Sequence, residues 1–164
     1  MGRPDPLTPA ASEVVLRAAT LDDEALLLEW RNDPAVVRMS LTGQPVAHAA
    51  HEDWLAVRLA GPNPRLWIAE EAGEAVGQVR VDRNHETGTV SIAVAAGHRG
   101  RGVGSRMLSA LMIELEADHE VRSLLAMVHP DNTASLRVFT RAEFQNIGSR
   151  QGFVVFERSC EAKR

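Results

Sequence analysis

A glycine-rich segment between a predicted strand and a predicted helix most constrains what this chain can fold into. The segment runs from His98 to Ser105 and has glycine at positions 100, 102 and 104. It follows an alternating apolar run, 89–95, and precedes apolar residues at helical spacing over 103–118. Glycines let backbone N–H groups approach an anion, which the positive end of the helix dipole also attracts. The pattern predicts a pyrophosphate site, with a tight turn that binds nothing as the alternative.

Two common phosphate-binding motifs do not fit this segment. A Walker A loop needs Gly-Lys-Ser/Thr, and the only lysine of the chain is Lys163. A dinucleotide fingerprint needs Gly-x-Gly-x-x-Gly within repeating βαβ units. Here the glycines alternate as Gly100, Gly102 and Gly104, and the units that follow do not repeat.

Hydrophobic periodicity predicts short strands and helices along the whole chain. Strands are expected at 14–18, 66–70, 75–82, 89–95 and 123–128, with two more near 144–158, and helices at 20–30, 34–39, 48–59, 103–118 and 133–141. Thr20 is the expected N-cap of the first helix, whose residues Leu21, Ala25 and Leu28 are expected to face inward, with Leu27 as a further candidate.

A second motif follows the glycine-rich segment. Residues 99–104 fit Arg/Gln-x-x-Gly-x-Gly/Ala, and residues 128–144 place Asn132, Ser135 and Phe139 after a predicted strand. In this order the two motifs closely resemble the signatures of the GNAT N-acetyltransferases, over roughly residues 14–158. The resemblance implies an α/β (α+β) GNAT fold: a mixed, mostly antiparallel central sheet of about six to seven strands with about four to five helices. Its fourth and fifth strands would splay apart to hold CoA.

The same resemblance implies acetyl-CoA as co-substrate, without a metal, and direct transfer of the acetyl group to a primary amine. It assigns cofactor binding to Ile92, Ala93 and Val94, to Arg99, Gly100, Arg101, Gly102, Val103, Gly104 and Ser105, and to Asn132, Ser135 and Phe139. Arg99 and Arg101 could add charge-assisted contacts. An acyl-cysteine intermediate is not expected, because the only cysteine, Cys160, lies at the end of the chain.

The resemblance leaves the general acid and the general base only partly assigned. Phe139 stands where many family members have a tyrosine that protonates the leaving thiolate, and the chain has no tyrosine. Either Ser135 or a water would supply that proton, or the thiolate leaves unassisted. His129 is a candidate general base because histidine titrates near neutral pH, with a solvent-facing turn histidine as the alternative.

The acceptor site is expected in the first third of the chain. Trp30, Arg31, Asn32 and His51 resemble a GNAT subset that acetylates nucleotide-linked amino sugars, in which the arginine and the histidine would meet the diphosphate. Alternatively, Arg31 caps its helix and Trp30 is core. Two other functions stay open: an acetyltransferase of ribosomal-protein or other N-terminal alanines, and a non-catalytic sensor that binds acyl-CoA.

Composition sets further bounds. The 164 residues, 45% of them hydrophobic, predict a single domain over 14–160 after a disordered tail, 1–13, that holds Pro4, Pro6 and Pro9. A net charge of −4 argues against a general nucleic-acid binder. A single cysteine, no signal peptide and no apolar run of about 18 residues predict a cytoplasmic enzyme with no membrane partner. The expected partner is a small-molecule amine, and a homodimer is possible.

Overall fold

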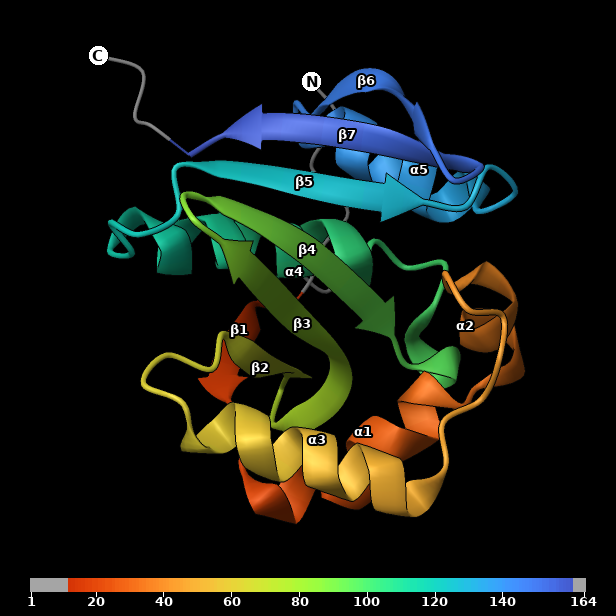
Figure 1. Cartoon of the computed structure of the whole chain (residues 1–164), viewed down its shortest axis with the longest axis vertical. Coiled ribbons are helices and arrows are strands. Elements are labelled where there is room, and N and C mark those ends of the chain that lie inside the picture. The colour runs from red at the N-terminus through yellow and green to blue at the C-terminus, as the bar shows by residue number, and fades with distance from the viewer. Residues whose placement is uncertain (1–11, 161–164) are drawn as a thin grey trace, which may run out of the picture.

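One mixed sheet organises the chain in the computed structural model, which describes residues 12–160 (Figure 1). Its strands are β1 (Val14–Ala18), β2 (Leu66–Glu71), β3 (Glu74–Asn84), β4 (Thr87–Val94), β5 (Ser123–Val128), β6 (Gln145–Arg150) and β7 (Phe153–Ser159). They lie in the order β1-β2-β3-β4-β5-β7-β6, and every neighbouring pair is antiparallel except β4 and β5. The predicted fold class is confirmed.

Five α-helices connect the strands, as the sequence predicted. They are α1 (Glu24–Arg31), α2 (Pro34–Met39), α3 (His48–Ala60), α4 (Val103–Glu116) and α5 (Thr133–Arg141), with short 3-10 turns η1 (Leu21–Asp23) and η2 (Ala96–His98). Local chemistry sets their ends. For example, the Asp33 carboxylate accepts from the N–H of Ala35 at 2.9 Å, and Pro34 fills the first helical position of α2.

The parallel contact between β4 and β5 is short. It covers three residue pairs, from Thr87 with Ser123 to Thr89 with Leu125. Beyond Thr89 the strands diverge toward their C-terminal ends (Figure 1), and β4 continues to Val94 paired with β3 alone. The predicted splay of the fourth and fifth strands is confirmed.

Each face of the sheet carries its own apolar cluster. The larger one lies under α4 and α5, where Met107, Leu108 and Leu111 are fully buried. The second lies under α1 and α3, where Leu27 and Leu55 pack with Leu66 and Ile68 of β2. Since neighbouring strand residues point to opposite faces, Leu66 and Ile68 face away from the α4 side.

The inner face of the first helix includes the candidate Leu27 but differs from the prediction at Leu21 and Ala25. Leu21 is 61% exposed and Ala25 is exposed, while Leu27 and Trp30 are buried. The first turn is the 3-10 turn η1, which turns the side chains differently from an α-helix that begins at Thr20. That shift explains why Leu21 and Ala25 miss the core.

Two further observations concern membrane spans and the predicted N-terminal tail. No helix within residues 12–160 has both the length and the apolar character needed to cross a bilayer. Most of the predicted tail, residues 1–11, lies outside the residues that the structure describes.

Candidate functional site

The glycine-rich segment forms a loop that ends as the N-terminus of α4. Gly100 and Gly102 have φ angles of 77° and 74°, the left-handed region that favours glycine, and Gly102 is the N-cap. The first N–H groups of a helix have no intrahelical acceptor, so those of Val103, Gly104 and Ser105 are free to meet an anion. The predicted pyrophosphate residues therefore lie together on one helix end.

Gly104 brings this helix end against β4. Its backbone is helical and buried, and a Cβ there would meet Val138 Cγ2 at 3.5 Å, Val94 Cγ2 at 3.6 Å and Ile92 Cδ1 at 3.9 Å. These are ordinary contacts, so neither φ nor packing requires glycine at this position.

The free edge of β4 faces the gap between the splayed strands. The carbonyl oxygen of Val94 accepts from Arg99 Nε at 3.0 Å, so it points away from β3. Strand backbones alternate, and Ile92 therefore directs its N–H toward the same gap, whereas the Ala93 carbonyl faces Gly77 of β3. Of the three predicted strand residues, Ile92 and Val94 have backbone groups available to a ligand.

The arginine side chains of the loop contact the protein itself. Arg99 Nη2 lies 3.3 Å from Asp33 Oδ1, which links the loop to the start of α2. Arg101 Nη2 lies 2.6 Å from His98 Nδ1. In this structure both side chains hold the loop in place, which leaves the backbone N–H groups at the start of α4 as the candidate anion-binding groups.

The second predicted motif forms the start of α5. The Asn132 side chain caps the helix by accepting from the N–H of Ser135 at 3.1 Å, and Ser135 is partly exposed. Phe139 is only 3% exposed, with ring centroids 5.1 Å from Phe144 and 6.0 Å from Phe156. The structure thus places Phe139 in the larger apolar cluster.

The surroundings of His129 argue against a general base. Its Nδ1 accepts from the backbone N–H of Asp131 at 3.1 Å, and its ring packs edge-on against Phe153 at 5.5 Å. In a neutral imidazole this hydrogen bond puts the proton on Nε2, which then has no lone pair to take another. His129 matches the alternative, a histidine that holds a turn.

Three of the four predicted acceptor residues have structural contacts. Trp30 is 7% exposed, and Asn32 makes two hydrogen bonds of 2.8 Å with the backbone of Val46. His51 is 5% exposed, and its Nδ1 lies 3.0 Å from Glu24 Oε1. A buried ring beside a carboxylate does not support the expected contact between His51 and a phosphate.

Arg31 is different. Its Nη2 makes only long hydrogen bonds, to Thr42 Oγ1 at 3.5 Å and the Gln44 carbonyl at 3.4 Å, and its Nη1 is buried without a partner. Burial and, secondarily, the nearby charge of Arg80 lower the pKa of the Arg31 guanidinium. Its surroundings thus disfavour a charge that nothing in the described chain neutralises.

Arg80 belongs to this region, although no sequence motif pointed to it. Its guanidinium carbon lies 5.6 Å from the centre of the Trp54 ring, and its Nε donates to Asp82 Oδ2 at 2.9 Å. Its Cα pairs with Ser91 of β4. An isolated arginine in a strand has no sequence signature, because its role depends on the neighbouring strand and on α3.

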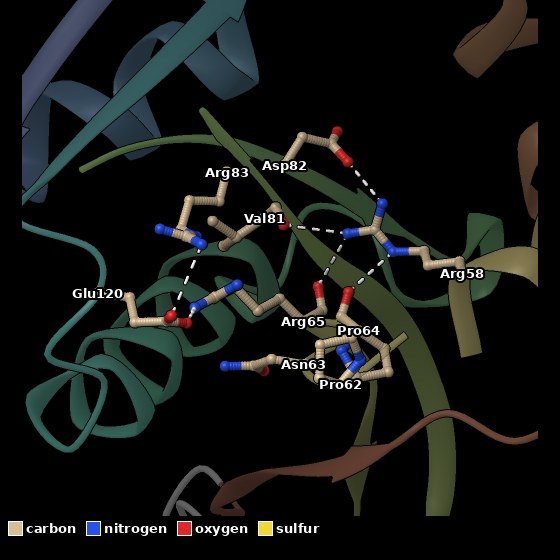
Figure 2. A pocket seen from close by; sticks show the side chains of 9 residues that line it. All are labelled: Arg58, Pro62, Asn63, Pro64, Arg65, Val81, Asp82, Arg83 and Glu120. Carbon is tan, nitrogen blue, oxygen red and sulfur yellow. Dashed lines mark hydrogen bonds and ion pairs between the residues drawn. The ribbon is translucent and has the colours of Figure 1, made fainter. Parts of the chain in front are cut away.

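A depression of about 540 Å³ lies elsewhere (Figure 2). Its charged side chains pair with one another: Arg58 with Asp82, Arg65 with Glu120, and Arg83 with Glu120. In the sheet, the Cα of Arg83 lies opposite that of Gly88, near the start of β4 and at the opposite end of that strand from the glycine-rich loop. We therefore do not place the functional site there. Within residues 12–160, no group of three or more His, Cys, Asp or Glu side chains could hold a metal.

Comparisons with known proteins agree with this geometry. The model of the acetyltransferase (GNAT) domain family matches residues 13–145. L-2,4-diaminobutyric acid acetyltransferase from Streptomyces anulatus is 39% identical over 74 residues, which cover 43% of this chain and 42% of that protein. Aminoglycoside N(6')-acetyltransferase type 1 from Klebsiella pneumoniae is 25% identical over 159 residues, covering 87% and 79%. The chain thus matches less than half of the diaminobutyrate enzyme's length.

The solved structures show the same fold. The aminoglycoside acetyltransferase AAC(6')-Ib, in complex with paromomycin and acetyl-CoA, superimposes with a TM-score of 0.75 at 23% identity. The match covers 90% of this chain and 93% of that one. These relatives act on diaminobutyrate and aminoglycosides, rather than belonging to the nucleotide-sugar or ribosomal-protein subsets that the sequence resembled.

Proposed function

Because the chain belongs to the GNAT acetyltransferase family, we propose that it transfers an acetyl group from acetyl-CoA directly to the primary amine of a small molecule. The observation that carries this proposal is the position of Gly104, at the start of α4 and against Ile92 and Val94 of the open edge of β4. One place therefore offers donors for a pyrophosphate and donors for a thioester carbonyl.

The backbone performs most of the proposed chemistry. The N–H groups of Val103, Gly104 and Ser105 bind the pyrophosphate, and Gly100 and Gly102 give the loop the shape this requires. The N–H groups of Ile92 and Val94 lie about 6.6 Å apart along the strand, so one of them donates to the thioester carbonyl oxygen as negative charge develops on it, and the other holds the pantetheine. Such fixed donors stabilise the transition state without moving.

Proton transfer depends on few side chains. His129 has its Nδ1 lone pair engaged, so we assign the amine proton to water. Phe139 has no proton to give, so the leaving thiolate takes one from Ser135 or from water. A thiolate is a good leaving group (free thiol pKa about 8.5), so this weak assistance is compatible with turnover.

The alternative, a CoA-binding protein without catalysis, draws support from Phe139 and from the engaged His129. Turnover separates the two functions. Purified protein with acetyl-CoA and a panel of amines, including L-2,4-diaminobutyrate, amino sugars, nucleotide-linked amino sugars and N-terminal alanine peptides, should release free CoA with at least one amine. Binding of acetyl-CoA without CoA release from any amine would favour the sensor.

The cofactor site has its own test. Ser105→Asp adds a carboxylate beside the proposed pyrophosphate and should raise the Kd for CoA at least about tenfold, equivalent to about 1.4 kcal/mol. The protein should stay folded, because a negative charge in the first turn favours the helix. Isothermal titration calorimetry measures the affinity.

Ser109→Asp is the matched control. Ser109 lies one turn further along α4, about 6 Å along the axis, and should change the Kd less than about threefold. Unchanged CoA affinity in a folded Ser105→Asp variant would place the pyrophosphate elsewhere.

A further inference from the structure

We propose that the acceptor carries an anionic group, a carboxylate or a phosphate, that binds between Arg31 and Arg80. The substrates are then acidic amines, not polycations such as aminoglycosides. This inference rests on the proposed function, because it names the class of amine that is acetylated.

The first observation is the unpaired guanidinium of Arg31. Its Nη1 is buried without a hydrogen-bond partner, and no carboxylate of residues 12–160 contributes to its pKa. Arg65, by contrast, is 6% exposed and pairs with both Asp118 and Glu120. Arg31 is only partly buried, but its Nη1 is enclosed without a partner and its other hydrogen bonds are long, so its guanidinium has donors that a ligand can use.

The second observation is the local excess of positive charge. Arg58 and Arg80 both bond to Asp82, and both guanidinium groups lie over the Trp54 ring, at 5.7 and 5.6 Å. Arg80 in turn is close enough to Arg31 to lower the pKa of that guanidinium. Arg58 and Arg80 therefore share one carboxylate, and Arg31 has none, so positive charge is in excess among these four side chains. An anion is attracted to this region and a polycation is repelled.

The third observation is the distance to the proposed chemistry. Arg80 pairs with Ser91, which directly precedes Ile92, and Val94 lies three residues beyond Ser91. At about 3.3 Å per strand residue, these steps place the anion site roughly 3–10 Å along the strand from the groups assigned to the thioester. An acceptor whose amine lies a few bonds from its anionic group, such as a diamino acid, spans that distance.

Matched acceptors that differ only in the anionic group provide the test. L-2,4-diaminobutyrate is compared with its carboxamide, and glucosamine 6-phosphate with glucosamine. The wild-type protein should prefer the anionic member of at least one pair by about 10- to 100-fold in kcat/KM, the range expected for hydrogen bonds to a charged group. The pair that shows the preference identifies whether the site binds a carboxylate or a phosphate.

Variants then locate the preference. Arg31→Gln should reduce the ratio to near one while the KM for acetyl-CoA stays unchanged, and Arg31→Lys should recover only part, since lysine lacks the planar fork. Arg83→Gln is the control, because it removes the same charge at an exposed site of β3, near the opposite end of the sheet from the glycine-rich loop. An equal ratio in wild type and Arg31→Gln, or a preference for the neutral members, would overturn the proposal.

A binding assay keeps this test separate from the proposed function. If no amine is acetylated, thermal unfolding with CoA and either L-2,4-diaminobutyrate or inorganic phosphate still reports on the anion site. Stabilisation of wild type but not of Arg31→Gln supports the site even without catalysis. Equal shifts in both proteins, or none in either, contradict it.

Discussion

At the scale of single residues, two arginines show how surroundings separate structure from function. Arg65 donates to Asp118 at 2.7 Å and also pairs with Glu120, and these bonds raise its pKa. The pKa of Arg31 is lowered instead, because burial is not offset by any carboxylate. The first residue contributes to folding, whereas the second imposes a cost on the protein while no ligand is bound.

Stability measurements should separate these two roles. Arg31→Met should raise the free energy of unfolding of the ligand-free protein by about 1–3 kcal/mol, because it removes an unsatisfied buried group. Arg65→Met should lower it by about 3–5 kcal/mol, because Asp118 would stay partly buried without its cation. Urea unfolding measures both. Destabilisation of similar size in the two variants would make Arg31 a structural residue.

Residue roles were predictable where the local chain determines them. The positive φ angles of Gly100 and Gly102, and the cap formed by Asn132, follow from short motifs. The roles of Arg80 and His129 do not. Arg80 depends on a neighbouring strand and on α3, and His129 on one hydrogen bond to Asp131 that leaves no trace in the sequence.

At the scale of secondary-structure elements, the close approach of β3 and β4 depends on Gly77. A Cβ there would overlap the carbonyl oxygen of Ala93 and lie 2.9 Å from Met107 Cε. Gly77 therefore lets β4 approach β3 at the residues proposed to bind the thioester, and lets α4 pack over them. Its φ angle is not positive, so the requirement comes from space alone.

Gly77→Ala should lower the free energy of unfolding by about 1–3 kcal/mol, since the backbone oxygen it meets cannot move without shifting β4. The Kd for CoA should rise as well, because Ile92 and Val94 move with Ala93. Gly73→Ala is a useful control, with open space around its Cβ but a positive φ, so that it tests backbone strain without a clash. A Gly77→Ala protein of unchanged stability and affinity would show that β4 adapts freely.

Most elements were predicted with the right type because their periodicity is strong. The strand Ser123–Val128 and the helix Thr133–Arg141 have the predicted bounds, while β3 extends to Asn84, two residues beyond its prediction. The predicted inner face of the first helix was wrong at Leu21 and Ala25. The sequence pattern assumed α-helical geometry from Thr20, and the chain adopts a 3-10 turn first, around the buried Asp23 carboxylate.

At the scale of the whole molecule, ion pairs connect segments that are far apart in the chain. Arg17 of β1 binds Asp23 before α1 and Glu70 of β2, and Arg65 before β2 binds Asp118 after α4. Hydrogen bonds from these arginines hold the pKa of Asp23 and of Asp118 below the usual range. Both carboxylates therefore prefer the ionised, folded state.

The sign of the pH dependence follows from those lowered pKa values. The stabilisation is fully present above the unfolded-state pKa of about 3.9 and is lost as the pH falls through the lower folded-state values. The free energy of unfolding should therefore fall steeply below about pH 4. Asp118→Asn should be less stable at pH 7 but lose less between pH 6 and pH 3. If wild type and Asp118→Asn lost the same free energy of unfolding between pH 6 and pH 3, Asp118 would not contribute to the acid sensitivity.

The stack of charged and aromatic side chains around Trp54 also has an optical consequence. The chain has three tryptophans and no tyrosine, so its ultraviolet emission comes from indole rings alone. Trp30 is enclosed in an apolar cluster, whereas Trp54 lies beneath two guanidinium groups and 5.3 Å from the His51 ring. The emission of an indole depends on the charges beside it. If the acceptor's anion binds at Arg80 as proposed, the emission of Trp54 should change on binding, which would report acceptor binding without a label or a reaction.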